Sequence, residues 1–358
     1  MEKTRRVKIV TGLKCNIQCV FCYYRDNLKA PNRPHAEIIK DLSYAWKRGI
    51  REVDFSGGEP TMHPDLPSLI AGAKSLGMER VCIISNGWRL ADRTYLKSLR
   101  TAGLDEILFS VHGPDETIHD SLTSTKGSFT RISEALANAA GEGLILRTNT
   151  VVTRVNYEAL NAIAEFVLPF RPDQVNFITI NDWCYAKHLV DKLMLSYSEM
   201  SPKLKTACDI LESRVKAVNV RYIPFCFMRG YERFVCNHKQ VPYDRYEWVQ
   251  RVRARLEVQN NLFRYMGIIG YGFFAGKAFR SLGEKSLADL LDESVTEALR
   301  RWNYRKGAVC RKCSLDFICD GLENSYAGKF GFKELCLFTG DKTGDPLLFK
   351  KVGKPDNI

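Results

Sequence analysis

The sequence contains no apolar run long enough to cross a bilayer as a helix. The longest apolar stretches, such as MGIIGYGFFAG at 266–276, are short and rich in glycine, whereas a transmembrane helix needs about 20 predominantly apolar residues. No apolar signal segment precedes the first cysteine motif either, because the chain opens MEKTRRVKIV. We therefore expect no membrane span and a cytoplasmic location.

The sequence also lacks the cysteine density of a disulfide-stapled protein and a concentrated patch of one charge. Its 12 cysteines are spread over 358 residues, unlike those of small secreted scaffolds. The formal net charge is +12, but Lys and Arg are scattered, with mild clustering only at 251–255 and 350–354. We expect most of this charge to be solvated surface, which leaves nucleic acid as a weak alternative. A phosphorylated or carboxylated substrate is compatible with the charge.

What the chain does have is size and a regular alternation of segments. With 45% hydrophobic and 26% charged residues it can bury a large core, and we expect a large domain at 1–200 and a smaller one at 201–358. Segments rich in β-branched residues alternate with amphipathic ones, which predicts a parallel α/β architecture. The predicted strands are 5–12, 51–57, 80–85, 106–113, 146–153 and 173–180, and the predicted helices are 35–49, 65–77, 92–103, 129–143 and 157–168.

Three cysteines near the start, Cys15, Cys19 and Cys22 in TGLKCNIQCVFCYY, have the spacing of a metal site. Thiolates favour zinc and iron–sulfur clusters, but closed zinc sites and ferredoxin-type clusters use four protein ligands. Here the local run stops at three, which would leave one iron of a cluster open to a small molecule. A zinc site completed from elsewhere and a disulfide cluster are the weaker alternatives.

This triplet, with Phe21 just before its last cysteine, resembles the signature of the radical S-adenosylmethionine (SAM) superfamily. The resemblance implies a 4Fe–4S cluster whose open iron binds SAM, and a 5′-deoxyadenosyl radical that takes hydrogen from unactivated C–H bonds. It also implies the fold, a partial (β/α)6 barrel related to the TIM barrel, with cofactor contacts at the carboxyl ends of the strands.

A second signature, Ser56-Gly57-Gly58-Glu59-Pro60, directly follows the predicted strand REVDF. In the radical SAM superfamily the similar segment contacts the amino group of SAM. Glycines let a backbone approach a ligand closely, and a carboxylate can bind an ammonium group. The resemblance therefore implies that Gly57, Gly58, Glu59 and Pro60 bind SAM.

Later strand ends offer further polar candidates, because ligand contacts gather there in parallel barrels. We predict that Asn86, Ser110 and Arg147 contact SAM, although Ser110 and Arg147 could equally be structural. His112 and His119 are either substrate contacts or histidines of a surface loop. Cys184, after the sixth predicted strand, could donate a hydrogen atom to a substrate radical, but a loop cysteine without a redox role is the stronger interpretation.

Beyond residue 200 the pattern changes to a predicted helix at 201–218, a loop-rich stretch and a helix near 286–303. The group Cys310-x2-Cys313-x5-Cys319 resembles SPASM or twitch extensions, which hold auxiliary 4Fe–4S clusters, although zinc competes here. Glu323 stands where a full SPASM pattern has a cysteine, so we expect one auxiliary cluster. We favour Cys226 as its fourth ligand, with Cys336 or Cys236 as the alternative.

The sequence thus predicts a radical SAM enzyme that acts on a small molecule and receives electrons from a donor such as flavodoxin or ferredoxin. Peptide modification is the alternative, and it is less favoured because the motif begins only fifteen residues into the chain. An auxiliary cluster mildly favours net oxidation. A non-catalytic electron carrier or scaffold is disfavoured, since it would not need the Gly-Gly-Glu-Pro segment.

Overall fold

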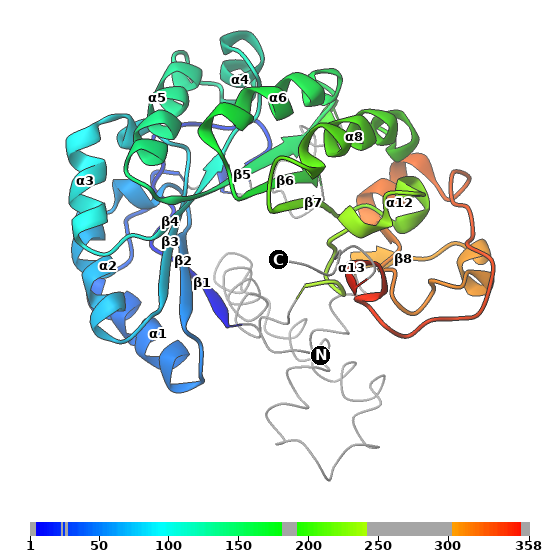
Figure 1. Ribbon diagram of the computed structural model, residues 1–358, viewed down its shortest axis with the longest axis horizontal. Coiled ribbons are helices and arrows are strands. Elements are labelled where there is room, and N and C mark those ends of the chain that lie inside the picture. Colours follow the sequence, from blue (N-terminus) through cyan, green and yellow to red (C-terminus); the bar gives the residue numbers. More distant parts are fainter. Residues whose placement is uncertain (1–4, 23, 26–27, 181–191, 242–302, 352–358) are drawn as a thin grey trace.

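The computed structural model describes residues 5–22, 24–25, 28–180, 192–241 and 303–351. Within these ranges seven parallel strands form one sheet in the order β1 to β7, so every strand pairs with its neighbour in the sequence. The sheet curls into a half-barrel with helices around its outer face (Figure 1). The strands are β1 (Arg6–Val10), β2 (Glu52–Ser56), β3 (Arg80–Ser85), β4 (Glu106–Ser110), β5 (Ile145–Val152), β6 (Gln174–Thr179) and β7 (Ala217–Arg221).

The convex face of the sheet is apolar and covered by the connecting helices. Side chains such as Phe55, Ile83 and Phe109 are fully buried there, as expected of parallel strands flanked by helices. This layer positions the site, because parallel strands with short crossovers bring all their carboxyl ends to one edge. The helices are α1 (His35–Lys47), α2 (Leu66–Ser75), α3 (Arg93–Thr101), α4 (Glu116–Thr123), α5 (Ser128–Gly141), α6 (Leu160–Val167) and α8 (Tyr197–Glu212).

The expected partial barrel is confirmed, but the count of six strands is wrong by one. The predicted helix over 201–218 ends at Glu212 as α8, and β7 follows and pairs with β6. Val218 and Val220 are buried while their neighbours are half-buried, a period of two that fits a strand and not a helix. The division at residue 200 stays a prediction, and the predicted helix near 286–303 lies outside the described residues.

The predicted strand 106–113 is shorter in the structure, and the short helix α4 begins soon after it, at Glu116. Strand β4 stops at Ser110, and the carboxylate of Asp115 caps α4 by accepting a hydrogen bond from the Ile118 backbone N–H (2.9 Å). His112 and His119 are 3% and 1% exposed. The interpretation of these two as surface-loop histidines is therefore wrong.

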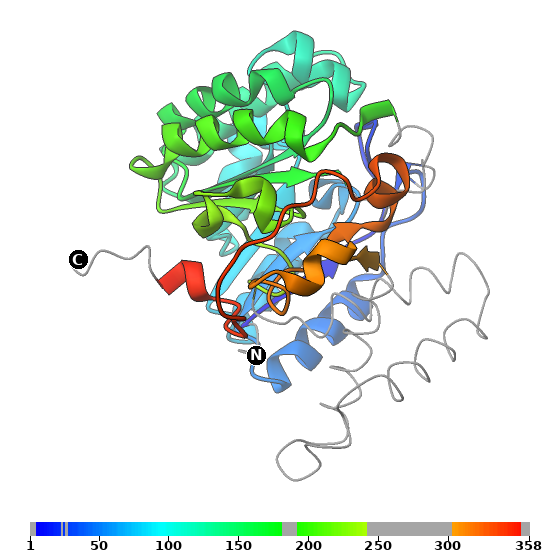
Figure 2. The same cartoon turned by 90° about the vertical axis from the view of Figure 1, so that its right-hand side faces the viewer.

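Residues 303–351 pack beside β7 and α8 (Figures 1 and 2). The rings of Tyr197 and Tyr326 stack with centroids 3.8 Å apart, which joins α8 to this part of the chain. Within the described ranges, no helix is long and apolar enough to cross a membrane. The elements here are a two-stranded sheet of β8 (Tyr304–Arg305) and β9 (Leu322–Glu323), with helices α12 (Asn324–Phe330) and α13 (Leu348–Lys351).

Candidate functional site

The first cysteine group lies on the loop that follows β1, at the carboxyl edge of the sheet. Backbone hydrogen bonds anchor this loop to the end of α4: the N–H of Gln18 donates to the Thr123 carbonyl (3.1 Å) and that of Val20 to Leu122 (2.9 Å). The N–H of Cys22 donates to the Cys19 carbonyl (3.1 Å), which folds the motif into a tight turn. The loop is therefore held in place by backbone hydrogen bonds.

The three thiols of this loop are partly buried and close enough to influence one another. Burial, together with the nearby Glu59 carboxylate and Cys22 thiol, raises the pKa of Cys15 to about 12. Burial, with Cys22 and Cys15 as neighbours, raises the pKa of Cys19 well above its usual value. A bound metal reverses this preference, because its charge stabilises thiolates. Three thiolates on one loop fit a 4Fe–4S cluster with an open iron.

The two glycines of the Gly-Gly-Glu segment pack against the backbone that leads into the cysteine loop. The N–H of Gly58 donates to the Gly12 carbonyl (2.9 Å), and the N–H of Glu59 donates to the Lys14 carbonyl (2.8 Å). A Cβ atom on Gly57 would lie 2.1 Å from the Gly12 oxygen, and one on Gly58 would lie 2.2 Å from the Leu13 oxygen. The glycines are therefore required for contact between two loops, a role that the sequence did not indicate.

The carboxylate of Glu59 is 3% exposed and accepts four hydrogen bonds. Two come from the N–H and hydroxyl of Thr61 (3.1 and 2.7 Å), one from the Ser85 hydroxyl (2.8 Å) and one from the Asn86 N–H (2.8 Å). Burial raises the pKa of Glu59, and the hydrogen bonds oppose that shift. Glu59 thus binds the end of β3 to the loop after β2.

Asn86 connects Glu59 to the cysteine loop. Its side-chain amide donates to Asn16 Oδ1 (2.9 Å) and lies 3.8 Å from the Cys15 sulfur. The structure therefore brings Glu59, Asn86 and Cys15 together at one corner of the barrel mouth. Pro60, the last residue of the second signature, is buried at the start of a short 3-10 turn, and the Glu59 carboxylate caps this turn by accepting the hydrogen bond of the Thr61 N–H. No motif in the sequence indicates the roles of Thr61 and Asn16.

Phe21 packs on His112, which follows β4. Their rings meet edge to face with centroids 4.7 Å apart, and His112 in turn stacks on His119 (5.8 Å). Burial lowers the pKa of His112 well below its usual value and that of His119 to about 4, so both rings are neutral at pH 7. The N–H of Val151 donates to His112 Nδ1 (3.3 Å), which fixes the ring beside the cysteine loop.

The other two candidates for SAM contacts at strand ends, Ser110 and Arg147, lie in different parts of the barrel. Ser110 is the last residue of β4, at the carboxyl edge of the sheet, and is half-buried. Arg147 does not reach that edge: its guanidinium pairs with Asp54 (3.1 Å) and with Glu106. Glu106 is the first residue of β4 and Asp54 is the middle residue of β2, so neither acid holds Arg147 at the carboxyl edge, and the structure does not support a SAM contact for it. Cys184 lies outside the described residues.

Arg147 belongs to a buried ion-pair cluster inside the half-barrel, which includes the first residues of β1 and β4, Arg6 and Glu106. Arg6 pairs with Asp54 (2.6 Å) and Glu106 (2.9 Å), and Glu106 is 1% exposed. Although burial opposes it, Arg147 and Arg6 lower the pKa of Asp54. Asp54, Cys82 and Glu106 have the proximity of a metal site, but the two guanidinium groups already balance the carboxylates. The cluster is structural.

The second cysteine group gathers around one small cavity beside β7. Burial raises the pKa of Cys226 to about 12, and the neighbouring thiols of Cys319, Cys336 and Cys310 contribute to this shift. The cavity has soft thiol donors on several sides, which fits an auxiliary iron–sulfur cluster. The cysteines that line it are Cys226, Cys310, Cys313, Cys319 and Cys336.

Both leading candidates for the fourth ligand thus reach the cavity. Cys226 is partly buried, whereas Cys336 is exposed and lies 3.9 Å from the Arg229 guanidinium. Cys236 is not among the residues that line the cavity; its backbone N–H donates to the Val220 carbonyl of β7 (2.9 Å). Cys226 and Cys336 remain the candidates for the fourth ligand.

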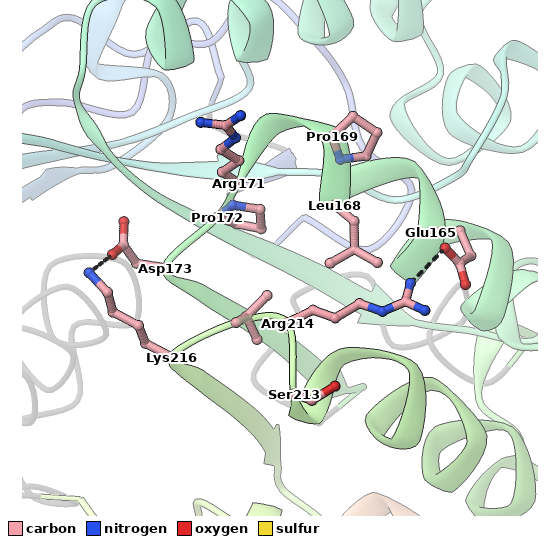
Figure 3. Close-up of a pocket in the computed structure, with 10 residues that line it drawn as sticks. Glu165, Leu168, Pro169, Arg171, Pro172, Asp173, Ser213, Arg214 and Lys216 are labelled. Carbon is pink, nitrogen blue, oxygen red and sulfur yellow. Dashed lines mark hydrogen bonds and ion pairs between the residues drawn. The ribbon is translucent and has the colours of Figure 1, made fainter. Parts of the chain in front are cut away.

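A surface hollow lies at the other end of the sheet, where β6 and β7 begin (Figure 3). Four of its charged side chains form two ion pairs: Arg214 with Glu165 (3.3 Å) and Lys216 with Asp173 (2.5 Å). Because parallel strands carry their ligand contacts at the carboxyl edge, this hollow is separate from the candidate site.

Residues 9–167 match the sequence profile of the Radical SAM superfamily. A probable GTP 3′,8-cyclase of Sulfolobus acidocaldarius is 28% identical over 60% of this chain and 68% of its own. The GTP 3′,8-cyclase of Synechococcus elongatus is 31% identical over 46% of this chain and 52% of its own. The chain thus spans about half to two thirds of these relatives.

Among solved structures, SuiB of Streptococcus suis bound to S-adenosylmethionine superposes with a TM-score of 0.51. The two chains are 18% identical, and the match covers 60% of this chain and 49% of SuiB. At that identity the likeness shows the fold alone. The profile match agrees with the cysteine triplet and with the half-barrel. Residues 9–167 form a radical SAM domain, and we identify the chain as a radical SAM enzyme.

Proposed function

We propose that the chain uses SAM to start radical chemistry on a purine nucleotide, with GTP as the first candidate. The observation that carries the SAM site is the junction of Glu59, Asn86 and Cys15 at one corner of the barrel mouth. The similarity to GTP 3′,8-cyclases supports the choice of substrate, and the net charge of +12 suits a triphosphate.

Each part of the site has a role in this proposal. Cys15, Cys19 and Cys22 hold the 4Fe–4S cluster, and Phe21 on His112 fixes the loop that carries them. When bound, the cluster and SAM supply a 5′-deoxyadenosyl radical that takes a hydrogen atom from the substrate. The buried Glu59 carboxylate places the end of β3 against this loop, so the protein supplies position rather than acid–base chemistry.

The proposed reaction on GTP joins C3′ of the ribose to C8 of the base. The C3′–H bond breaks and its hydrogen goes to 5′-deoxyadenosine; the C3′ radical then adds to C8, and one electron and one proton complete the ring. A second electron is consumed in cleaving SAM. Both electrons come from a one-electron donor of low potential, for which reduced flavodoxin or ferredoxin is suited. The product is an isomer of GTP.

The second cysteine group suits the final electron transfer. It begins at Cys226, which closely follows β7, so a cluster there would border the substrate side of the barrel mouth. We propose that the cysteines of this cavity would hold one auxiliary 4Fe–4S cluster, which would supply one-electron chemistry there.

Anaerobically reconstituted protein tests the proposal when it is reduced and given SAM with GTP deuterated at C3′. We expect deuterated 5′-deoxyadenosine and a GTP isomer with a new retention time. Deuterium-free 5′-deoxyadenosine would reject abstraction at C3′, and no 5′-deoxyadenosine under any reductant would reject SAM cleavage. A Cys15→Ala variant is the matched negative control.

A further inference from the structure

The surface of residues 303–350 carries charge of almost one sign. Among these described residues, Asp341 is the one exposed acid, against seven exposed cations. The exposed cations are Arg305, Lys306, Arg311, Lys312, Lys329, Lys333 and Lys342. On residues 5–180, by contrast, exposed acids such as Glu79 and Glu134 accompany the exposed cations. Within the described part of the chain, net positive surface charge is therefore densest beside the second cysteine group.

Several of these cations gather around an exposed aromatic ring. Phe317 is 58% exposed, and the Lys342 ammonium lies 5.1 Å from the centre of its ring. The Lys239 ammonium donates a hydrogen bond to the Phe317 carbonyl (2.8 Å), and that of Lys342 donates to the Arg311 carbonyl (2.9 Å). Lys312 follows Arg311 and is also exposed. We call Phe317, Lys239, Lys342, Arg311 and Lys312 the basic patch.

The basic patch lies directly beside the thiol cavity. Arg311 and Lys312 occupy the two positions between Cys310 and Cys313, on a short 3-10 turn. Phe317 stands two residues before the next cysteine of the group. All three of these cysteines line the cavity. A molecule seated on the patch would therefore lie within a few residues of the thiols, on the outside of the protein.

The acids near the basic patch do not balance its charge. Asp316 pairs with both Lys306 (2.9 Å) and Lys342 (3.8 Å), so one carboxylate serves two lysines. Among the hydrogen bonds and ion pairs of the described residues, none involves the side chain of Arg311 or of Lys312. With Asp316 and the single exposed acid included, the patch keeps a surplus of positive charge. Such a surface attracts an acidic partner.

We propose that the basic patch is the docking surface for an acidic protein that carries single electrons. Transient redox partners meet through small interfaces steered by opposite charges. Phe317 supplies an apolar centre and the four cations a charged rim. A nucleic-acid track would call for several stacking rings, and the patch has one.

The inference rests on the proposed function for the chain's need of electrons at low potential. In each encounter the carrier is oxidised by one electron, and the cofactor-loaded chain is reduced by one; no covalent bond forms or breaks. The position of the patch beside the second cysteine group, and its charge, come from the structure itself.

Anaerobic calorimetric titration of the full, cluster-loaded chain with oxidised flavodoxin, an acidic one-electron carrier, tests docking without turnover. Basic cytochrome c is the control carrier and should not bind measurably. We expect flavodoxin to bind, and its affinity to fall about tenfold between about 50 mM and about 500 mM salt, because salt screens exposed charges. Phe317→Ala should weaken binding about threefold and leave its salt dependence unchanged, because the lost contact is apolar.

Charge reversal locates the docking surface. We expect Lys342→Glu to weaken flavodoxin binding about fivefold, and Arg311→Glu combined with Lys312→Glu to weaken it about tenfold. The matched control is Lys40→Glu combined with Lys47→Glu, the same change of charge at two exposed positions of α1, on the opposite side of the half-barrel (Figure 1). Iron is measured in every variant. If the variant between the cysteines loses iron, Lys342→Glu decides.

The outcomes separate the docking surface from the proposed function. Equal binding in wild type and all patch variants, or no binding by wild type, overturns the docking surface. Tighter binding of cytochrome c or of a single-stranded oligonucleotide than of flavodoxin also overturns it. Patch variants that make wild-type amounts of 5′-deoxyadenosine with dithionite, which needs no docking, and less with reduced flavodoxin support it. Wild type that makes none with dithionite overturns the proposed function, while the binding data still decide the patch.

Discussion

The backbone N–H of Asn86 donates to the Glu59 carboxylate at 2.8 Å, while the side chain of Asn86 donates to Asn16 beside Cys15. Asn86 therefore connects the buried Glu59 carboxylate, which follows β2, to the loop segment that carries Cys15. This link explains why the Gly-Gly-Glu segment and the cysteine triplet, far apart in sequence, occur together: neither is correctly placed without the other.

Asn86→Ala should slow SAM cleavage without preventing cluster assembly. The substitution removes the hydrogen bond to Asn16 but keeps the backbone contact with Glu59, so we expect about tenfold less 5′-deoxyadenosine per loaded cluster. The rate is measured at matched iron content, with Asn138→Ala as the control, because the Asn138 amide on α5 donates to the carbonyls of Leu90 and Ala91 and not to the site. An unchanged rate at equal iron would show that the amide has no part in SAM cleavage.

Gly58→Ala should impair assembly of the first cluster. The new Cβ would lie 2.2 Å from the Leu13 oxygen and 2.4 Å from the Lys14 oxygen, so the backbone leading to Cys15 has to move. We expect reconstituted iron to fall by about four atoms per chain, the content of one cluster. Gly141→Ala is the matched control, because nothing lies within 4 Å of its Cβ position. Full iron in both variants would contradict the packing argument.

The fold was largely predictable because its signals are local. Alternating strands and helices carry their own periodicity, and β1 to β6 follow it. The seventh strand was missed because Val215, Lys216, Ala217 and Val218 fit the end of an amphipathic helix as well as a strand; only pairing with β6 decides between them. Tertiary pairing overrides such short ambiguous segments.

The residues of the candidate site could be predicted where they belong to a sequence motif, but not where only strand pairing brings them together. The cysteine triplet and Glu59 were named from their motifs, and the structure brings Glu59 and Cys15 together through Asn86, while their roles stay predictions. The alignment of β4 to β7 depends on strand register, which no motif in the sequence encodes. The prediction that Arg147 contacts SAM placed its side chain at the carboxyl edge of the sheet, but the side chain pairs with Asp54 instead. The sequence of a strand does not tell toward which end of the strand a long side chain extends.

Cys313→Ser and Cys236→Ser should separate ligands from bystanders in the C-terminal region. Cys313 lines the thiol cavity, whereas Cys236 does not. We therefore expect Cys313→Ser to lose about four iron atoms per chain and Cys236→Ser to keep the wild-type content. Iron and sulfide analysis after anaerobic reconstitution measures both. Zinc in place of iron at this cavity would support the alternative metal.

Acidification should destabilise the barrel through His119. Burial lowers its pKa to about 4, although Asp120 opposes the shift, and the unfolded value is about 6.5. The unfolded chain therefore binds more protons between these values, so stability is complete above about pH 6.5 and falls by about 3 kcal/mol toward pH 4. Urea unfolding of wild type and His119→Gln measures it. An equally steep pH dependence in the variant would exclude His119 as the cause.

Arg147→Met should unfold the protein more easily without touching the SAM corner. It leaves the buried carboxylates of Asp54 and Glu106 with one guanidinium fewer, and breaking a buried ion pair costs about 3–5 kcal/mol. Arg214→Met is the matched control, because Arg214 and Glu165 in the surface hollow of Figure 3 are more than half exposed. Such a pair contributes under about 1 kcal/mol.

Urea unfolding gives the stability of both arginine variants, and SAM binding is measured on the folded protein at low temperature. We expect Arg147→Met to shift the unfolding midpoint strongly and to keep SAM affinity, and Arg214→Met to change neither. The reverse pattern, in which Arg147→Met keeps wild-type stability and loses SAM affinity, would support the prediction that Arg147 contacts SAM. It would also mean that the ion pairs of Arg147 break when SAM binds, since one guanidinium cannot contact both Asp54 and a ligand at the carboxyl edge.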